Sequence, residues 1–305
     1  MSRVLAIGGA HIDRIGRLRA AHLAGASNPG AWETMPGGGI FNVARNLSRL
    51  GHAVTLVSLR GGDDAGELVA RAAQDAGVID APITFLDRAT ASYTAILEPD
   101  GNLVTALADM AIYDLIPPRR LLTARFREKV DACELILCDA NLPSPTLETL
   151  GMIARRTGKP LVAVAISPAK VVRFINALPD LAMLFMNKAE ARALTDKDEP
   201  TIDHLRAIGL PGGTVTAGPD PVVLFTSQSE FTGTPSQLPK LADVTGAGDA
   251  LASGVLDGWL RQLPQESWLS RGMALARMTA SARGPVCHDL SIELLNKVVA
   301  EETAG

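Results

Sequence analysis

Apolar and polar residues follow two alternating patterns along most of this chain. Short continuous apolar runs, typical of buried strands, occur at 4–7, 53–59, 135–140, 160–166, 183–187 and 214–218. Segments whose apolar residues recur at helical spacing occur at 36–51, 64–77, 118–130 and 144–157, and three consecutive helices are expected from 247 onward. Apolar strands that alternate with amphipathic helices are typical of a mostly parallel sheet covered on both faces. The pattern therefore predicts an α/β fold.

Two regions break this alternation. Residues 92–109 contain two β-rich runs around Asp100-Gly101, which is a hairpin signal without an intervening helix. Residues 11–35 also lack a helical pattern. We expect these regions, about 11–35 and 90–110, to form a small sheet that stands off the main body like a lid. Because no linker or repeat interrupts the chain, residues 1–305 are expected to form a single domain.

Composition narrows the class of protein. Of the 305 residues, 47% are apolar and 20% are charged, which is typical of a globular chain. The net charge of −4 and the aromatic content of 4% give no reason to expect binding to nucleic acid or to a membrane surface. Three cysteines without a disulfide pattern, an N-terminus unlike a signal peptide and the lack of a bilayer-length apolar run favour a cytoplasmic protein.

The segment LADVTGAGDA at 241–250 is the strongest candidate for chemistry. Its glycines allow the backbone N–H groups of Gly246, Ala247 and Gly248 to point one way, at the positive end of a helix, where they would stabilise an anion. Asp249 would then have a lowered pKa and could accept a proton from an attacking hydroxyl, as phosphoryl transfer requires. The alternative is that Asp249 only caps the helix, which is the commoner role for a bare Gly-x-Gly-Asp.

Two motifs further along the chain are weak when taken singly. In NKAE, Asn187 and Glu190 have the spacing of a capping box, although Glu190 could also serve a hydrated Mg²⁺ near nucleotide phosphates. Thr216 and Gly218 lie at a strand end and turn, where they could offer a hydroxyl and a close backbone to phosphate or ribose. Each pair therefore has both a structural and a functional interpretation.

Polar residues also follow the first predicted strand. Asp13 lies just beyond it, and ligands of open α/β sheets bind beyond the carboxyl ends of the strands. Gly37 and Gly38 open the helix that carries Asn42, so backbone N–H groups and an amide would face the same crevice. These residues are candidates for binding several hydroxyl groups, although Asn42 alone would more often be solvated.

The motifs DVTGAGDA (243–250), PGGGIFNVARNLSRLG (36–51) and NKAE (187–190) occur in the order and spacing of the ribokinase-like (PfkB) sugar kinases, which the chain resembles over nearly its whole length. The resemblance implies a three-layer αβα domain with a small β-sheet lid, which matches the two irregular regions. It also implies transfer of the γ-phosphoryl group of ATP, with Mg²⁺, to a sugar hydroxyl.

The resemblance further implies a role for each candidate residue. Asp249 would be the base, and the amides of Gly246, Ala247 and Gly248 would form the anion hole. The residues implied for the nucleotide and its magnesium ion, which Glu190 would hold through water, are Asn187, Glu190, Thr216, Gly218 and Thr245. Those implied for the acceptor are Asp13, Gly37, Gly38, Asn42 and Asn141. Asp243 and Val244 resemble a loop for a monovalent cation such as K⁺.

Within this family, the segments 8–16, 27–30, 90–116 and 138–143 most resemble kinases that act on pseudouridine. The implied reaction gives pseudouridine 5′-phosphate, whereas ribose or another nucleoside is the alternative acceptor and a non-catalytic nucleoside sensor the alternative of another class. Departures from the pattern are Phe41 in place of Arg, Val164-Ala165 in place of Asp-Pro, and Pro221 in place of Gly. We also expect a homodimer formed through the lid, because pairing would cover its bare sheet edges.

Overall fold

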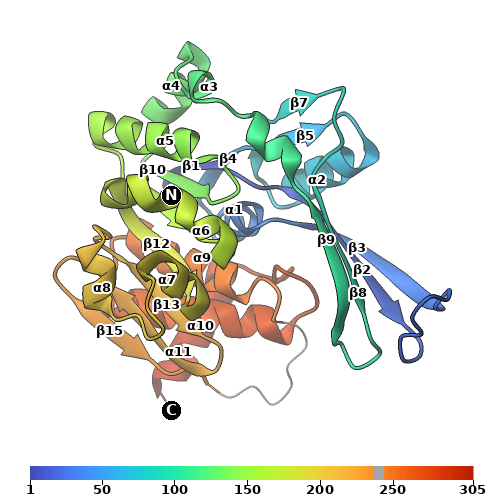
Figure 1. The fold of residues 1–305 in the computed structure, drawn as a ribbon. Helices are drawn as coiled ribbons and strands as arrows, with labels where there is room; N and C mark the ends of the chain where they lie inside the picture. Colours follow the sequence, from blue (N-terminus) through green and yellow to red (C-terminus); the bar gives the residue numbers. More distant parts are fainter. Residues whose placement is uncertain (237–243, 305) are drawn as a thin grey trace.

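The computed structural model describes residues 1–236 and 244–304, whose main sheet has the strand order β15-β14-β13-β12-β11-β10-β1-β4-β6 (Figure 1). In this order the strands are Glu230–Gly233, Asp220–Phe225, Gly213–Ala217, Leu181–Asn187, Leu161–Val164, Leu135–Asp139, Arg3–Ile7, Ala53–Val57 and Ile79–Asp80. The pairs from β13 to β6 are parallel, and β14 and β15 add to one edge in antiparallel orientation. The predicted mostly parallel sheet is therefore confirmed.

Helices cover both faces of this sheet. On one face lie α1 (Gly39–Arg49), α2 (Asp64–Asp75), α9 (Ala247–Leu260) and α10 (Gln265–Ser281), and α11 (Ile292–Ala304) packs on α10. On the other lie α3 (Pro118–Leu121), α4 (Ala124–Ala132), α5 (Ser144–Thr157), α6 (Pro168–Val171), the 3-10 helix η2 (Val172–Asp180), α7 (Lys188–Thr195) and α8 (Ile202–Ala207). This is the three-layer αβα arrangement that the resemblance implied.

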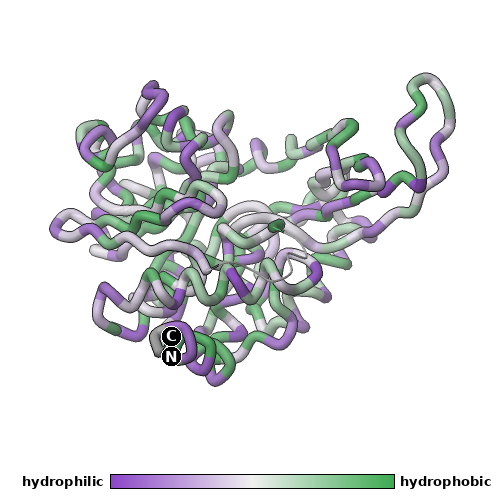
Figure 2. Tube along the Cα trace, turned by 90° about the horizontal axis from the view of Figure 1, so that it is seen from below, coloured by the Kyte–Doolittle hydropathy of each residue, from purple (hydrophilic) through white to green (hydrophobic). Residues whose placement is uncertain are grey.

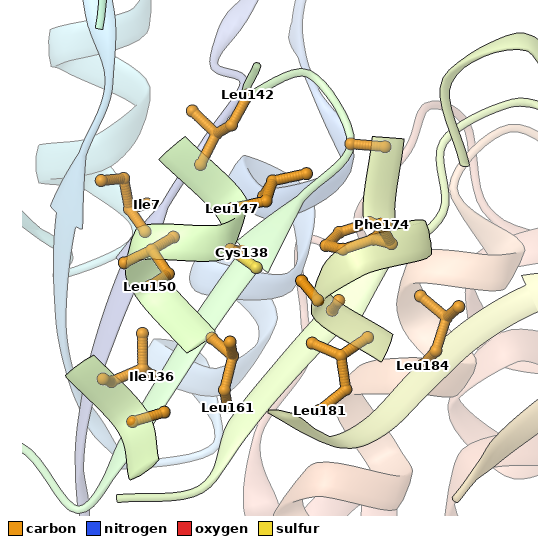
Figure 3. Packing of buried hydrophobic residues seen from close by; sticks show 14 of the residues in the cluster. Ile7, Ile136, Cys138, Leu142, Leu147, Leu150, Leu161, Phe174, Leu181 and Leu184 are labelled. Carbon is orange, nitrogen blue, oxygen red and sulfur yellow. The ribbon is translucent and has the colours of Figure 1, made fainter. Parts of the chain in front are cut away.

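Alternation along β1 shows why both faces are apolar. Leu5 and Ile7 point into the cluster under α5 and η2, whereas Val4 and Ala6 point into the cluster under α1 and α9. Figure 3 shows the first cluster, in which Leu147 and Leu150 of α5 and Phe174 of η2 lie over the strands. A strand buried on both faces must be apolar at every position, which is why its sequence reads as a continuous run.

A second sheet extends away from this body. It has the order β3-β2-β8-β9, with strands Gly30–Gly37, His11–Leu18, Ser92–Leu97 and Leu103–Asp109. Figures 1 and 2 show it as a narrow arm beside the main sheet. The predicted small sheet and the hairpin at Asp100-Gly101 are confirmed, and the base of the arm packs on α2. A short pair, β5 (Leu59–Gly61) with β7 (Ile83–Phe85), and the 3-10 helix η1 (Ala111–Leu115) connect the two sheets.

Some predicted boundaries were wrong. The helix expected over 118–130 is two helices, because Thr123 accepts a hydrogen bond from the Phe126 N–H and so caps a new helix, α4. The antiparallel strands β14 and β15 were not predicted, since they are short and lie at an edge of the sheet. Cys133, Cys138 and Cys287 are free thiols, as the lack of a disulfide pattern indicated. Among the described residues, no helix is long and apolar enough to cross a membrane.

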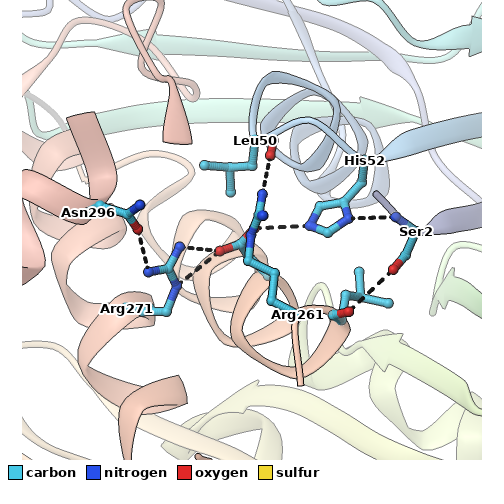
Figure 4. A network of polar contacts seen from close by, with 8 residues as sticks. Ser2, Leu50, His52, Arg261, Arg271 and Asn296 are labelled. Carbon is cyan, nitrogen blue, oxygen red and sulfur yellow. Dashed lines mark hydrogen bonds and ion pairs between the residues drawn. The ribbon is translucent and has the colours of Figure 1, made fainter. Parts of the chain in front are cut away.

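A buried charge network joins the C-terminal helices to the start of the chain (Figure 4). The carboxylate of Asp257 in α9 accepts hydrogen bonds from His52 Nε2 at 3.0 Å, from Arg261 Nε at 2.8 Å and from Arg271 Nε at 2.9 Å. Beyond it, Arg271 donates to Asn296 of α11 and Arg261 donates to the Leu50 carbonyl. The network fixes α9, whose first turn carries Asp249, against α1, α10 and α11.

Candidate active site

Asp249 lies in the first turn of α9, but it does not cap this helix. The N-cap is Gly246, which has a left-handed backbone (φ 77°), and among the described residues no side chain makes a capping hydrogen bond there. Asp249 is the third residue of the helix, so its carboxylate is free to point toward the neighbouring α1. The capping interpretation of the Gly-x-Gly-Asp motif is therefore wrong.

The two glycines of this motif have different surroundings. A methyl group on Gly246 would overlap the Pro285 carbonyl oxygen, and φ of 77° is unfavourable for any other residue. Gly248, in contrast, has no described atom outside its own helix within 4 Å of the position of an added Cβ. Gly246 thus makes the turn possible, whereas no described residue fills the space beside Gly248 at the helix N-terminus. The Ala247 N–H donates to the Val244 carbonyl at 3.1 Å, so the predicted anion hole stays a prediction.

This difference predicts opposite effects for two alanine substitutions. Gly246→Ala should lower the free energy of unfolding by about 1–2 kcal/mol from backbone strain alone, and by more through the overlap with Pro285. Gly248→Ala should leave stability unchanged or slightly raised, because alanine favours helix, yet raise KM for ATP by filling space beside the helix N-terminus. Thermal denaturation and steady-state kinetics measure both effects. A Gly246→Ala protein with the same melting temperature as the wild type would contradict the prediction.

Two residues of α1 position the carboxylate of Asp249: Asn42 bonds to it directly, and Arg45 bonds to Asn42. Asn42 Nδ2 donates to Asp249 Oδ2 at 2.7 Å, and Arg45 Nη2 donates to Asn42 Oδ1 at 2.6 Å. Asn42 is buried, so the alternative interpretation, in which it is a solvated first-turn residue, is wrong. Asp249 itself is half-buried, and its second oxygen, Oδ1, lies beside Gly39 at the start of α1.

Burial raises the pKa of Asp249 to about 7, and the charges of Asp139 and Glu190 act in the same direction. The hydrogen bond from Asn42 and the charge of Arg45 act against them. The sequence predicted a lowered pKa, and this was wrong, because loss of water around the carboxyl outweighs the stabilising groups. The apolar Val164, the last residue of β11, and Ile166, two residues later, lie with Asp249 around Gly39 and contribute to this dry environment.

A run of glycines lets the N-terminus of α1 lie between Asp13 and Asp249. A Cβ on Gly37 would overlap the carboxylate of Asp13, and one on Gly38 would overlap the Gly9 carbonyl. The corresponding position on Gly39 is 3.3 Å from Asp249 Oδ1. The structure therefore brings the predicted acceptor residues of β2 and α1 beside the predicted base.

Two residues that the sequence analysis missed orient Asp13. His11 Nε2 lies 3.4 Å from Asp13 Oδ1, and His11 Nδ1 lies 3.2 Å from the Tyr113 hydroxyl. With its proton on Nε2, the ring donates to the carboxylate and accepts from Tyr113. Both His11 and Tyr113 are buried, and burial keeps the pKa of Tyr113 well above its ordinary value, so its hydroxyl stays protonated. No local signal marks this pair, because residue 113 is far from residue 11 in the chain.

Asn141 lies at the carboxyl end of β10, where its amide is already engaged. Its Nδ2 donates to Asp139 Oδ2 at 2.9 Å, and its Oδ1 accepts from Lys170 Nζ at 2.6 Å. Asp139 also accepts from the Gly9 N–H, and burial raises its pKa. Binding of an acceptor by Asn141 stays a prediction. Asp139 and Lys170, which contact Asn141, were not selected by the sequence analysis.

The predicted nucleotide residues gather at the ends of two adjacent strands. Asn187 of β12 pairs with Thr216 of β13, and Gly218 follows in a turn, where no described atom lies within 4 Å of an added Cβ. Asn187 and Glu190 form the predicted capping box, in which the Asn187 N–H donates to Glu190 Oε2 at 2.7 Å. Burial raises the pKa of Glu190.

Few side chains near the ends of β12 and β13 could bind a metal ion. Among the described residues, no group of three or more His, Cys, Asp or Glu side chains could hold a metal ion. A single carboxylate, that of Glu190, fits a Mg²⁺ ion that keeps most of its waters and binds nucleotide phosphates. Thr245 and Val244 are exposed before the turn at Gly246, and Asp243 lies outside the described residues, so the monovalent-cation loop stays a prediction.

A doubly wound αβα body, a projecting sheet and a carboxylate at a helix N-terminus are the features that the sequence resemblance implied for a phosphotransferase of a small alcohol. The chain belongs to the pfkB family of carbohydrate kinases, whose model matches residues 1–289. It is therefore an ATP-dependent kinase of a sugar or nucleoside.

Three known proteins illustrate the relationship. Pseudouridine kinase from Escherichia coli (strain K12) is 26% identical over 297 residues, covering 95% of this chain and 94% of that protein. Guanosine-inosine kinase from Exiguobacterium acetylicum is 26% identical over 291 residues, covering 90% of this chain and 93% of that protein. The solved structure of a carbohydrate kinase from Agrobacterium tumefaciens is 50% identical with a TM-score of 0.89, covering 98% of this chain and 97% of that one.

Proposed function

We propose that this kinase transfers the γ-phosphoryl group of ATP to the 5′-hydroxyl of pseudouridine, giving pseudouridine 5′-phosphate. The observation that carries the proposal is the half-buried Asp249 in the first turn of α9, whose carboxylate accepts a hydrogen bond from Asn42. The likeness of the lid and substrate segments to pseudouridine kinases, and a relative of that name matching 95% of the chain, support the choice of acceptor.

In this proposal, different residues around the crevice bind the acceptor, take its proton and bind the phosphates. Asp13, with Gly37 and Gly38, binds hydroxyls of the acceptor and directs the reacting one toward Asp249. Asp249 accepts the proton of that hydroxyl as its oxygen attacks the γ-phosphorus, and the N–H groups at the start of α9 stabilise the charge on the transferred group. Mg²⁺, held through water by Glu190, neutralises phosphate charge when it is bound.

Other acceptors are the main alternative. A relative with the same 26% identity is named for guanosine and inosine, so a purine nucleoside, or ribose itself, competes with pseudouridine as the acceptor. Phe41, where the pattern has Arg, is fully buried under Arg45 and does not line the crevice, so it makes no contact with a base. Membership of a kinase family and the presence of Asp249 beside the predicted acceptor residues both argue against a sensor without catalysis.

A substrate panel tests the acceptor. ADP release is measured with pseudouridine, uridine, guanosine, inosine and ribose, each with ATP and Mg²⁺. Pseudouridine should give the highest kcat/KM, and uridine, which differs from it only in the base linkage, is the matched control. Turnover of another acceptor without turnover of pseudouridine would disprove this assignment and leave the kinase class intact.

We also propose a cytoplasmic homodimer formed through the lid. Trp32 and Leu107 are exposed large apolar residues, and the strand register puts them on the same face of the second sheet. A partner that covers this face would remove apolar surface from water. Light scattering of the purified chain should give twice the mass of one chain, and Trp32→Glu should reduce it to one.

A further inference from the structure

Arg45 is a buried arginine that sits one turn after Asn42 on α1. Its Nη2 donates to the Pro36 carbonyl at 3.0 Å and to Asn42 Oδ1 at 2.6 Å. Its guanidinium carbon lies 4.5 Å from the centre of the Phe41 ring, and its Nε is buried without a hydrogen-bond partner among the described residues. Burial lowers the pKa of Arg45 to about 10, so it keeps its charge at neutral pH.

The contacts of Arg45 decide how the amide of Asn42 is turned. A guanidinium only donates hydrogen bonds, so the atom of Asn42 that faces it must be the oxygen. The amide nitrogen is then directed to Asp249 Oδ2. The opposite orientation would set donor against donor at Arg45 and acceptor against acceptor at Asp249.

We propose that Arg45 is a positioning residue for the base: it fixes the amide of Asn42 so that one oxygen of Asp249 is held and the other faces the acceptor. The proposal rests on the function proposed for Asp249. A purely structural role would be to anchor the Pro36 carbonyl before α1. The charge of Arg45 would then still act on Asp249, but the amide of Asn42 would bond to Asp249 with or without Arg45.

Charged groups from several elements face this pair. Asp139 at the end of β10 and Glu190 on α7 face Asp249, and both disfavour its charged form. Asp13 on β2 and Arg49 on α1 face Arg45. Among the groups that act on Asp249, Asn42 and Arg45 are those that favour its carboxylate. Loss of Arg45 should therefore raise the pKa of Asp249.

The direct test is a titration of Asp249 by ¹³C NMR of the carboxyl carbon, with the signal assigned by its loss in Asp249→Asn. Arg45→Met should move the midpoint upward by about one unit, as expected for loss of a nearby opposite charge, whereas Arg45→Lys should restore most of it. Arg49→Met is the matched control, since Arg49 lies one turn further on α1, donates to the Cys287 carbonyl and should leave the midpoint unchanged. An unchanged midpoint in folded Arg45→Met protein would overturn the proposal.

A measurement on the wild type covers the case in which Arg45→Met does not fold. The side-chain NH₂ signals of Asn42 should shift with the same midpoint as the carboxyl of Asp249, and failure to do so would also overturn the proposal. Neither titration needs ATP or an acceptor. Absence of turnover would therefore refute the proposed function without affecting this test. In active protein, Arg45→Met should lower kcat/KM about tenfold below the midpoint and less at higher pH.

Discussion

Asp249→Asn is expected to lower kcat by about 10²–10⁴-fold, the usual contribution of a general base, while leaving the affinity for ATP nearly unchanged. The amide cannot take the proton of the acceptor hydroxyl, but it has almost the same shape as the carboxylate. Because Asn42 holds only one oxygen of Asp249, at 2.7 Å, the helix start should keep its geometry in the variant. Steady-state kinetics and calorimetric binding of ATP measure the two quantities separately.

Asp203→Asn provides the matched control for this substitution. Asp203 also lies in the first turn of a helix, α8, but its side chain is 92% exposed and it has no place in the crevice. This variant should have the activity of the wild type. Turnover by Asp249→Asn within a few-fold of the wild type would contradict the role of Asp249 as the base.

The pH dependence of the wild type follows from the raised pKa of Asp249, about 7. The base is active without its proton, so kcat/KM should rise as the pH passes through about 7 and level off above it. A base with the ordinary Asp pKa of 3.8 would give a flat profile over this range. The measured profile therefore distinguishes the raised pKa from the lowered one that the motif alone suggested.

Asp257→Ala should be the most destabilising single substitution in the buried network. It would leave Arg271, which is 4% exposed, without its carboxylate partner, at a cost of about 3–5 kcal/mol in the free energy of unfolding. Burial alone would raise the pKa of Asp257, but hydrogen bonds from His52 and Arg261 and the charge of Arg271 hold it below the ordinary value of 3.8. The contribution of this carboxylate is therefore complete above that pH and is lost as acid protonates it.

Denaturant unfolding of three variants tests this expectation. Asp257→Ala should show the full loss, and the double variant Asp257→Leu with Arg271→Met should recover part of it, because no buried charge is then left unpaired. Arg261→Met is the milder control, since Arg261 is 31% exposed and Asp257 keeps its hydrogen bonds from His52 and Arg271. If Asp257→Ala unfolds at the wild-type midpoint, the network does not hold α9 in place.

Much of the fold could be predicted from short-range patterns. The limits of α5 and the hairpin of the lid came from periodicity and turn residues within one segment. The capping box of Asn187 and Glu190 was also predictable, because its two hydrogen bonds join residues three apart. The edge strands β14 and β15 were missed because they are short and their pairing depends on β13 rather than on their own sequence.

The sequence by itself determined the αβα class, the lid and the position of Asp249 in the chain, because periodicity and motif spacing are local properties. Only the tertiary structure decided the chemical state of that residue. The pKa of Asp249 depends on its burial, on Asn42 and Arg45 of α1 and on the charges of Asp139 and Glu190, all distant in sequence. Likewise, His11 meets Tyr113 across 102 positions of the chain. The burial of a side chain and the charges that act on it come from all the segments that the fold brings around it. The pattern within one segment therefore does not predict its pKa.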